Sequence, residues 1–435
     1  FLHMFKDKGN TVEESWAFMP QELLPNLREL RANVPTGVHS VYGMDSPPVA
    51  YVKRNASGTI EKAWLFVGMR RGGKSYYALN ITNPDSPKYM WKVDPSSAGM
   101  SDMGQSWAEP IVTFIPGVPA GNTSASSASP VVIIGGGYNP STKDSASVGT
   151  DDTTGRSVYI LNAETGALVH QFGTTSGSNK TKLPSIVDSI PNSVAILDSN
   201  NDKLTDRLYA TDTGANIWRM DLPSTSSSDS TNPWTAFKFA SLGGSSLATD
   251  RRFFAEPTVA QTAFTNISEV PTALEIGVLY DVTSAPPTTV SQNIAFGKKR
   301  GWYYNFASPG EKSLSASTII QGKVYFTSYV PGDATSANQC LAAGQGRLRG
   351  YYLHKGTRSY TQEYLEMGAR VPDTPQLVIP PNGTSDSYMY LIGIGSAAAD
   401  MDKVDDDESD GCAAGDDKCI GGGLGVNKIY YHIDE

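Results

Sequence analysis

The feature that most constrains this chain is a two-strand unit that recurs along its length. Each copy has an apolar strand ending in glycine, a turn, and an aromatic-containing strand that ends in Asn or Asp. In the clearest copy, residues 131–135 (VVIIG) are followed, after a long insertion, by residues 157–162 (SVYILN) and the turn 163–166. Each unit exposes apolar faces that only a neighbouring unit can cover, so the repeat predicts an all-β fold with sheets stacked in a ring.

Further copies follow the same pattern. Two are clear, residues 64–68 with 75–80 and residues 207–212 with 216–221, both with turns of hairpin length. Three are weaker: residues 293–297 with 302–306, 324–327 with 350–353, and 389–395 with 428–432. The second strands begin near seven positions: Leu2, Tyr76, Val158, Ile217, Trp302, Tyr351 and Ile429. Seven units predict one β-propeller domain over residues 1–435, in which the first and last strands share a blade.

The spacing between units exceeds that of a compact blade, so insertions must fill the difference. Polar, Gly/Ser/Thr-rich stretches without periodicity predict mobile surface loops at residues 122–129, 141–154 and 224–232. A helix is expected within residues 21–32, where four leucines could share a face, and Pro25 would kink or shorten it.

Composition supports the all-β interpretation and limits the partners. The chain has 42 Gly and 27 Pro, which supply turns. Its net charge of −9 disfavours nucleic acid and anionic lipid surfaces as partners. No uninterrupted apolar stretch predicts a membrane span. The chain begins at Phe1 without an initiator Met or a leader, so we expect a domain excised from the C-terminal part of a longer protein.

Three cysteines, Cys340, Cys412 and Cys419, are too few for a disulfide scaffold. Cys412 and Cys419 flank a short Gly- and Asp-rich segment. A disulfide between them would close a small loop and leave Cys340 without a disulfide partner. A secreted or periplasmic setting fits the Ser/Thr/Asn-rich composition.

The strongest site signal is residues 198–206 (DSNNDKLTD), placed between two predicted strands. An EF-hand-type calcium loop offers side-chain oxygens at positions one, three and five and a backbone carbonyl at position seven. Here the alternate oxygen ligands would be Asp198, Asn200, Asp202 and the Leu204 carbonyl, with Asp206 closing the site at position nine. This spacing predicts a Ca²⁺ site.

An acidic solvated turn is the alternative, because Asp and Asn favour turns without any metal. Three carboxylates within nine residues would repel one another without a cation, which favours the site. Lys203 occupies position six, where glycine usually provides a positive φ, so backbone strain and weak affinity are expected. A second acidic run at residues 400–408 lacks the alternate spacing and favours a solvated loop.

Motifs for catalysis are weak. Residues 68–75 (GMRRGGKS) match the phosphate-loop spacing, but residues 76–80 form a strand pattern and not the helix that such a loop needs. No Gly-x-Ser-x-Gly elbow is present, and the five histidines have no catalytic or zinc spacing: His3, His39, His170, His354 and His432. The sequence therefore predicts no catalytic residue and no enzyme.

The order of several segments resembles one family. These are residues 2–5 (LHMF), 104–110 (GQSWAEP), the loop 198–206, and 216–222 (NIWRMDL) directly after it. The repeat unit resembles quinoprotein-type propeller blades, and the whole order is similar to the PilC/PilY family of type IV pilus tip proteins. The most specific part is the calcium loop that feeds a strand leading to the Trp-Arg-x-Asp strand.

The resemblance implies a modified seven-bladed, quinoprotein-like β-propeller with long inserted loops. It also implies that calcium in this loop tunes pilus extension against retraction, and with it pilus biogenesis, twitching motility and adhesion. It places the chain at the pilus tip on the bacterial surface, secreted or associated with the periplasm or outer membrane, with pilin or minor pilin subunits as partners. Any contact with a host surface would belong to regions that this chain does not contain.

Two alternatives stay open. A quinone-dependent dehydrogenase would use the same fold and calcium, but a vicinal cysteine pair is absent and aromatic docking residues do not recur in register. A passive scaffold would use calcium only to stabilise the folded state.

Overall fold

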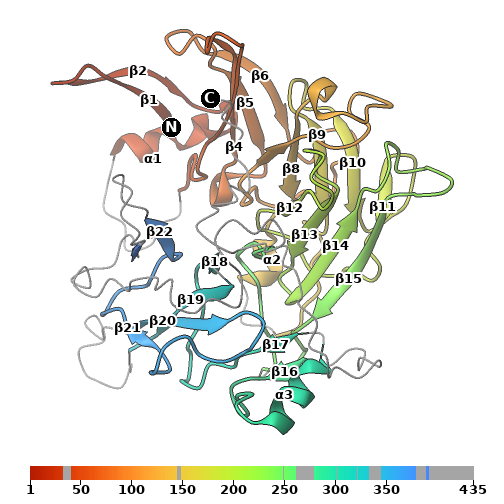
Figure 1. The fold of residues 1–435 in the computed structure, drawn as a ribbon. Helices are drawn as coiled ribbons and strands as arrows, with labels where there is room; N and C mark the ends of the chain where they lie inside the picture. The colour runs from red at the N-terminus through yellow and green to blue at the C-terminus, as the bar shows by residue number, and fades with distance from the viewer. Residues whose placement is uncertain are drawn as a thin grey trace. The chain divides into compact units, whose positions relative to one another are not determined.

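The computed structural model describes residues 1–32, 41–144, 148–247, 249–260, 279–299, 301–320, 322–332, 344–378 and 388–390. Regular structure in these residues is mostly β (Figure 1). The chain divides between Pro257 and Thr258 into two compact units, called unit 1 and unit 2 below. In the described residues the strands form seven separate open sheets, three of which have only two strands.

Unit 1 contains four of these sheets. The first pairs β1 (Leu2–Asp7) with β2 (Val12–Phe18). The second has the order β3 (Val49–Arg54), β4 (Ile60–Val67), β5 (Tyr76–Asn80) and β6 (Lys88–Val93). The third has the order β11 (Lys180–Lys182), β10 (Leu168–Gly173), β9 (Val158–Asn162), β8 (Val131–Gly135) and β7 (Ile111–Thr113). The fourth has the order β12 (Ala195–Leu197), β13 (Arg207–Thr211), β14 (Asn216–Asp221) and β15 (Thr235–Ser241).

The three clearest repeat units are confirmed as adjacent antiparallel strand pairs: β4 with β5, β8 with β9, and β13 with β14. In the third sheet, alternate side chains of the same strand face different clusters. Val131 and Ile133 pack with Trp218 of β14, whereas Val132 and Ile134 pack with Trp64 of β4. Because successive side chains of a strand point to opposite faces, this sheet is covered on both faces by its neighbours in sequence. That double burial explains the nearly continuous apolar runs of β8 and β9.

His170 on β10 is buried in the core of unit 1, 2% exposed, with its ring edge against Phe172 and Trp234 and its Nε2 3.0 Å from Thr181 Oγ1. Burial lowers the pKa of His170 to about 4. In the unfolded chain the imidazole binds a proton near pH 6.5, whereas in the folded chain it does so only near pH 4. The free energy of unfolding should therefore fall by roughly 3 kcal/mol as the pH drops from about 6.5 to about 4, and then level off. We expect His170→Gln to flatten this part of a pH series of urea unfolding curves, and the exposed His3→Gln to leave it in place. A slope unchanged in His170→Gln would contradict the assignment.

Unit 2 has the remaining sheets. β16 (Tyr280–Asp281) pairs with β17 (Trp302–Tyr303) in parallel. A four-stranded sheet has the order β18 (Thr318–Ile320), β19 (Lys323–Val330), β20 (Gln345–Tyr352) and β21 (Leu365–Glu366), and β22 (Gln376–Val378) pairs with β23 (Tyr388–Tyr390). The β19–β20 pair confirms the predicted unit at residues 324–327 and 350–353.

One predicted strand is wrong. Residues 293–297 lie in helix α3 (Val290–Gly297) and do not pair with residues 302–306. The helix starts with a capping box, in which the Thr289 side chain accepts from the Gln292 backbone N–H and the Gln292 side chain accepts from the Thr289 backbone N–H. Such a box satisfies two of the free donors at a helix start, so a run of apolar residues that suits a strand becomes helical.

The helix expected at residues 21–32 is present as a 3₁₀ turn (Gln21–Asn26), which contains Pro25, followed by α1 (Leu27–Ala32). Of its leucines Leu23 is buried. The prediction of a mobile polar loop over residues 141–154 is wrong in part. These residues include the end of α2 (Pro140–Lys143), and the side chains of Lys143 and Asp152 are buried.

Several predictions lie outside the described residues: the three cysteines, the acidic run 400–408, and the strand at 428–432 that would close the ring with residues 2–7. Among the described residues, no helix has the length and apolar character needed to cross a bilayer.

Candidate metal site

The candidate calcium loop joins β12 to β13 in unit 1. These strands pair antiparallel with Leu197 opposite Arg207, so residues 198–206 form the turn that closes one end of the pair. The predicted ligands therefore all lie in one hairpin loop, as the spacing required.

The first half of the loop curls around the carboxylate of Asp198, which is 8% exposed. Its Oδ1 accepts from the backbone N–H groups of Asn200 at 3.3 Å and Asp202 at 3.2 Å, and its Oδ2 accepts from the N–H of Lys203 at 2.7 Å. Three amides directed at one carboxylate hold the chain in a tight arc.

Two residues in this arc have left-handed backbone conformations, Asn201 at φ 60° and Lys203 at φ 68°. The prediction that position six requires a positive φ is confirmed. Lysine adopts this conformation at a cost of about 1–2 kcal/mol that glycine would avoid.

The remaining carboxylates bond within the loop. Asp202 accepts from the N–H of Leu204 at 2.8 Å, and Asp206 accepts from the backbone N–H and the hydroxyl of Ser199 at 3.0 and 2.6 Å. In the described residues no three or more His, Cys, Asp or Glu side chains gather into a group that could hold a metal ion. The oxygen-only donor set and the backbone arc fit calcium by type, whereas the carboxylates are not gathered around one point.

The second half of the loop is fixed to the neighbouring sheet. Leu204 and Thr205 are both 1% exposed. The N–H of Thr205 donates to the carbonyl of Phe114 at 2.7 Å, and its hydroxyl lies 2.7 Å from that of Thr113 on β7. Sequence reasoning missed these anchors, because five strands (β8 to β12) separate Thr113 from the loop along the chain and Thr113 carries no motif.

The phosphate-loop look-alike is a 3₁₀ turn (Arg70–Gly72) that leads from β4 into strand β5. A strand presents no row of free N-terminal amides to a phosphate, so the hairpin interpretation is confirmed. Of the histidines, His3 is exposed on β1 and His170 is buried in β10.

Comparisons with known proteins converge on one group. The profile of the PilY1 β-propeller domain matches residues 1–272. The type IV pilus biogenesis factor PilY1 of Pseudomonas aeruginosa strain PAO1 is 29% identical over 225 residues, which cover 51% of this chain and 16% of that protein. A PilY1 homolog of Xylella fastidiosa strain Temecula1 is 25% identical over 414 residues, covering 80% of this chain and 25% of that protein. The chain thus spans a quarter or less of the length of these relatives.

The crystal structure of the Pseudomonas aeruginosa PilY1 C-terminal domain has a similar fold. It superposes with a TM-score of 0.55 and 17% sequence identity, covering 90% of this chain and 89% of that domain. Because the match covers 90% of this chain, it includes residues of both unit 1 and unit 2.

Proposed function

The chain belongs to the PilY1 family, and on this basis we propose that it is the calcium-binding β-propeller of a type IV pilus biogenesis protein. Its role is non-catalytic: calcium in the loop 198–206 regulates a protein contact at the pilus tip. The relatives it matches are named pilus biogenesis factors, which supports this class of function over an enzyme.

The observation that carries the calcium proposal is the backbone of the loop. A left-handed residue at position six and three amides directed at the first aspartate form the arc of an EF-hand-type loop. The ligands would be the side chains of Asp198, Asn200, Asp202 and Asp206 and the carbonyl of Leu204, which together supply only oxygen. In this arrangement calcium would neutralise carboxylates that repel one another.

We further propose the finer features that follow from family membership. The fold is a seven-bladed, quinoprotein-like propeller forming one domain over residues 1–435. The domain acts at the bacterial surface at the pilus tip, where pilin or minor pilin subunits are its partners, and it affects extension, retraction, twitching motility and adhesion.

Calorimetry tests the metal site. We expect the wild-type chain to bind one Ca²⁺, and the double variant Asp198→Ala/Asp202→Ala to give no binding heat, because two of the four side-chain ligands are lost. Asp229→Ala is the matched control, since Asp229 only caps its own exposed turn by accepting from Thr231 and Asn232. Calcium binding that persists in the double variant would rule out this site.

Lys203→Gly gives a second arm to the same experiment. Glycine adopts the observed φ of 68° without the cost that lysine bears, and it removes a positive charge beside the ion. We expect tighter calcium binding in Lys203→Gly. Weaker binding in this variant would mean that the loop does not hold calcium in an EF-hand-type arc.

The regulatory role is separated from a passive scaffold in cells that carry the full-length protein. If calcium is a switch, the double variant keeps its surface level but loses control of twitching motility. If calcium is only structural, the protein itself disappears from the surface.

A further inference from the structure

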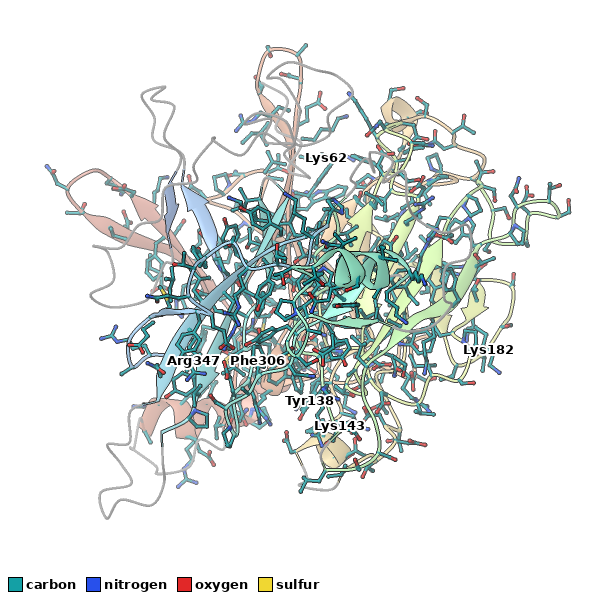
Figure 2. The ribbon with its side chains drawn as sticks, turned by 60° about the horizontal axis from the view of Figure 1, so that its bottom comes forward. Lys62, Tyr138, Lys143, Lys182, Phe306 and Arg347 are labelled. Atoms are coloured by element: carbon teal, nitrogen blue, oxygen red, sulfur yellow. The ribbon has the colours of Figure 1, made fainter. Side chains whose placement is uncertain are left out.

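A second polar cluster lies in unit 1 around α2, within residues 141–154, where the sequence predicts only a polar surface loop. Lys143 ends α2, and its side chain is only 4% exposed. Its Nζ donates to Asp188 Oδ1 at 2.6 Å and to the carbonyl of Thr150 at 2.7 Å, and lies 3.6 Å from Asp152 Oδ2. Figure 2 labels Lys143 and the nearby Tyr138. The ammonium group thus donates hydrogen bonds to two oxygens and forms an ion pair with a third, the Asp152 carboxylate.

The acceptors around this ammonium come from different parts of unit 1. Asp188 lies between β11 and β12, and its side chain is 13% exposed. The Asp152 side chain is 0% exposed, and it also accepts from the Ser189 N–H at 2.8 Å and the Thr213 hydroxyl at 2.9 Å. The Thr213 donor fixes Asp152 to the fourth sheet, because Thr213 is in the β13–β14 turn.

The approach of Asp188 depends on a glycine in the same turn. A Cβ at Gly214 would lie 2.0 Å from Asp188 Oδ2. Any other residue at position 214 would therefore displace the carboxylate that holds the ammonium. Close packing of this kind indicates a formed site and not a chance surface contact.

The next residue along the chain forms an ion pair with a different sheet. Asp144 accepts from Nη1 and Nη2 of Arg71, at 2.8 and 3.1 Å, and from the hydroxyl of Tyr138 at 2.7 Å. Arg71 lies in the turn between β4 and β5 and also stacks over the Trp107 and Tyr138 rings. Lys143 and Asp144 thus connect one short helix to the sheet before it and the sheet after it.

We propose that Asp188, Asp152 and the Thr150 carbonyl form a binding site for a primary ammonium group, which Lys143 fills from within the same chain. Together with the ion pair between Arg71 and Asp144, this site connects the second, third and fourth sheets of unit 1. The site selects a primary ammonium because two hydrogen-bond acceptors and one further carboxylate oxygen surround a single nitrogen. The flat, wider guanidinium of arginine does not match that arrangement.

The Lys143 ammonium and the Asp152 carboxylate are both buried, at 4% and 0% exposed. Removing one partner of a buried ion pair leaves the other charge without compensation, which costs far more than the loss of an exposed pair. Without the ammonium, two carboxylates, one fully buried, would face each other with no cation between them. The ammonium itself, and not the four-carbon stem, should therefore determine stability.

Chemical rescue tests this directly. Lys143→Ala removes the atoms of n-propylammonium, so that ion can refill the site. We expect Lys143→Ala and Lys143→Met to lower the Tm of the chain by about 5 °C or more, and added n-propylammonium to restore most of the loss in Lys143→Ala alone. Tetramethylammonium at equal ionic strength, which has no N–H donor, and neutral 1-propanol should restore nothing.

Lys62→Met is the matched control, because Lys62 forms an exposed ion pair with Glu164 at 3.5 Å, and its Tm should change by less than about 2 °C. A Lys143→Met variant with the same Tm as the wild type, or equal stabilisation by all three additives, would overturn the proposal.

If Lys143→Ala does not fold, Asp188→Asn serves instead. Hydrogen exchange should then rise at residues 140–144 and 150–156, and unchanged exchange there would equally refute the site.

Discussion

Replacing Trp218 with alanine is expected to lower the free energy of unfolding of unit 1 by about 3–5 kcal/mol. Trp218 on β14 is fully buried and packs with residues from the third and fourth sheets, among them Ile133 and Leu208. Deleting an indole at this position leaves a cavity between two sheets that strand pairing prevents from collapsing. The measurement is urea unfolding followed by circular dichroism.

The indole also has a polar role. Its Nε1 donates to Asp212 Oδ2 at 2.7 Å, and burial raises the pKa of Asp212. Trp218→Phe keeps most of the volume and removes only this donor, so we expect a smaller loss of about 1–3 kcal/mol. Equal effects of the two substitutions would mean that the hydrogen bond, and not packing, dominates. The exposed Phe239→Ala on β15 is the control and should have little effect.

The second large effect is expected in unit 2. Glu311→Ala should cost about 3–5 kcal/mol, because Glu311 is the carboxylate between two arginines in the interior. Its Oε1 accepts from Arg349 at 2.8 Å and from the Ser328 hydroxyl at 2.6 Å, and its Oε2 accepts from Arg347 at 3.0 Å. The Glu311 side chain is 0% exposed, and that of Arg349 is 1% exposed. Although burial acts to raise the pKa of Glu311, the bonds from Ser328 and the arginines hold it below its usual value.

The size of this effect reflects the charges left behind. Without Glu311, the buried guanidinium of Arg349 loses its carboxylate partner. It keeps a hydrogen bond to the neutral Ser328 hydroxyl at 2.6 Å and contacts with aromatic rings, at 5.1 Å from Tyr304 and 5.2 Å from Phe306. The double variant Glu311→Ala/Arg349→Met should therefore be more stable than Glu311→Ala alone. Glu366→Ala, at an exposed position on β21, is the control. A thermal melt in which Glu311→Ala behaves like Glu366→Ala would disprove the stabilising role assigned to Glu311 and its two arginine partners.

Strand pairs of unit 1 could be predicted from sequence because their apolar runs are buried on both faces. Within β8 and β9, residues 131–134 and 158–161 are all Val, Ile, Tyr or Leu, and the turn-favouring residues Gly135 and Asn162 stand only at the strand ends. The failure at residues 293–297 has the opposite cause. A run as short as Asn293 to Gly297, with apolar side chains only at residues 294–296, suits a strand or a helix equally. The deciding signal was the capping box formed by Thr289 and Gln292 just before it.

The candidate metal loop was predictable because its ligands are close together in sequence, and even the left-handed conformation of Lys203 followed from its position. The ammonium site was not predictable. Lys143 and Asp188 are 45 residues apart, in a polar loop and an irregular connection without periodicity. Only the packing of successive sheets brings them together.

The ion pairs that connect α2 to the second and fourth sheets, called the clasp below, also affect how fast unit 1 unfolds. Its ion pairs join residues 73 positions apart, Arg71 with Asp144, and 45 positions apart, Lys143 with Asp188. Contacts between finished sheets form after each sheet has closed its own local pairs, since the loop-closure entropy must be overcome first. Interactions that form after the transition state slow unfolding and leave the folding rate unchanged. We therefore expect substitutions that break the clasp to raise the unfolding rate of unit 1 and to leave its folding rate unchanged.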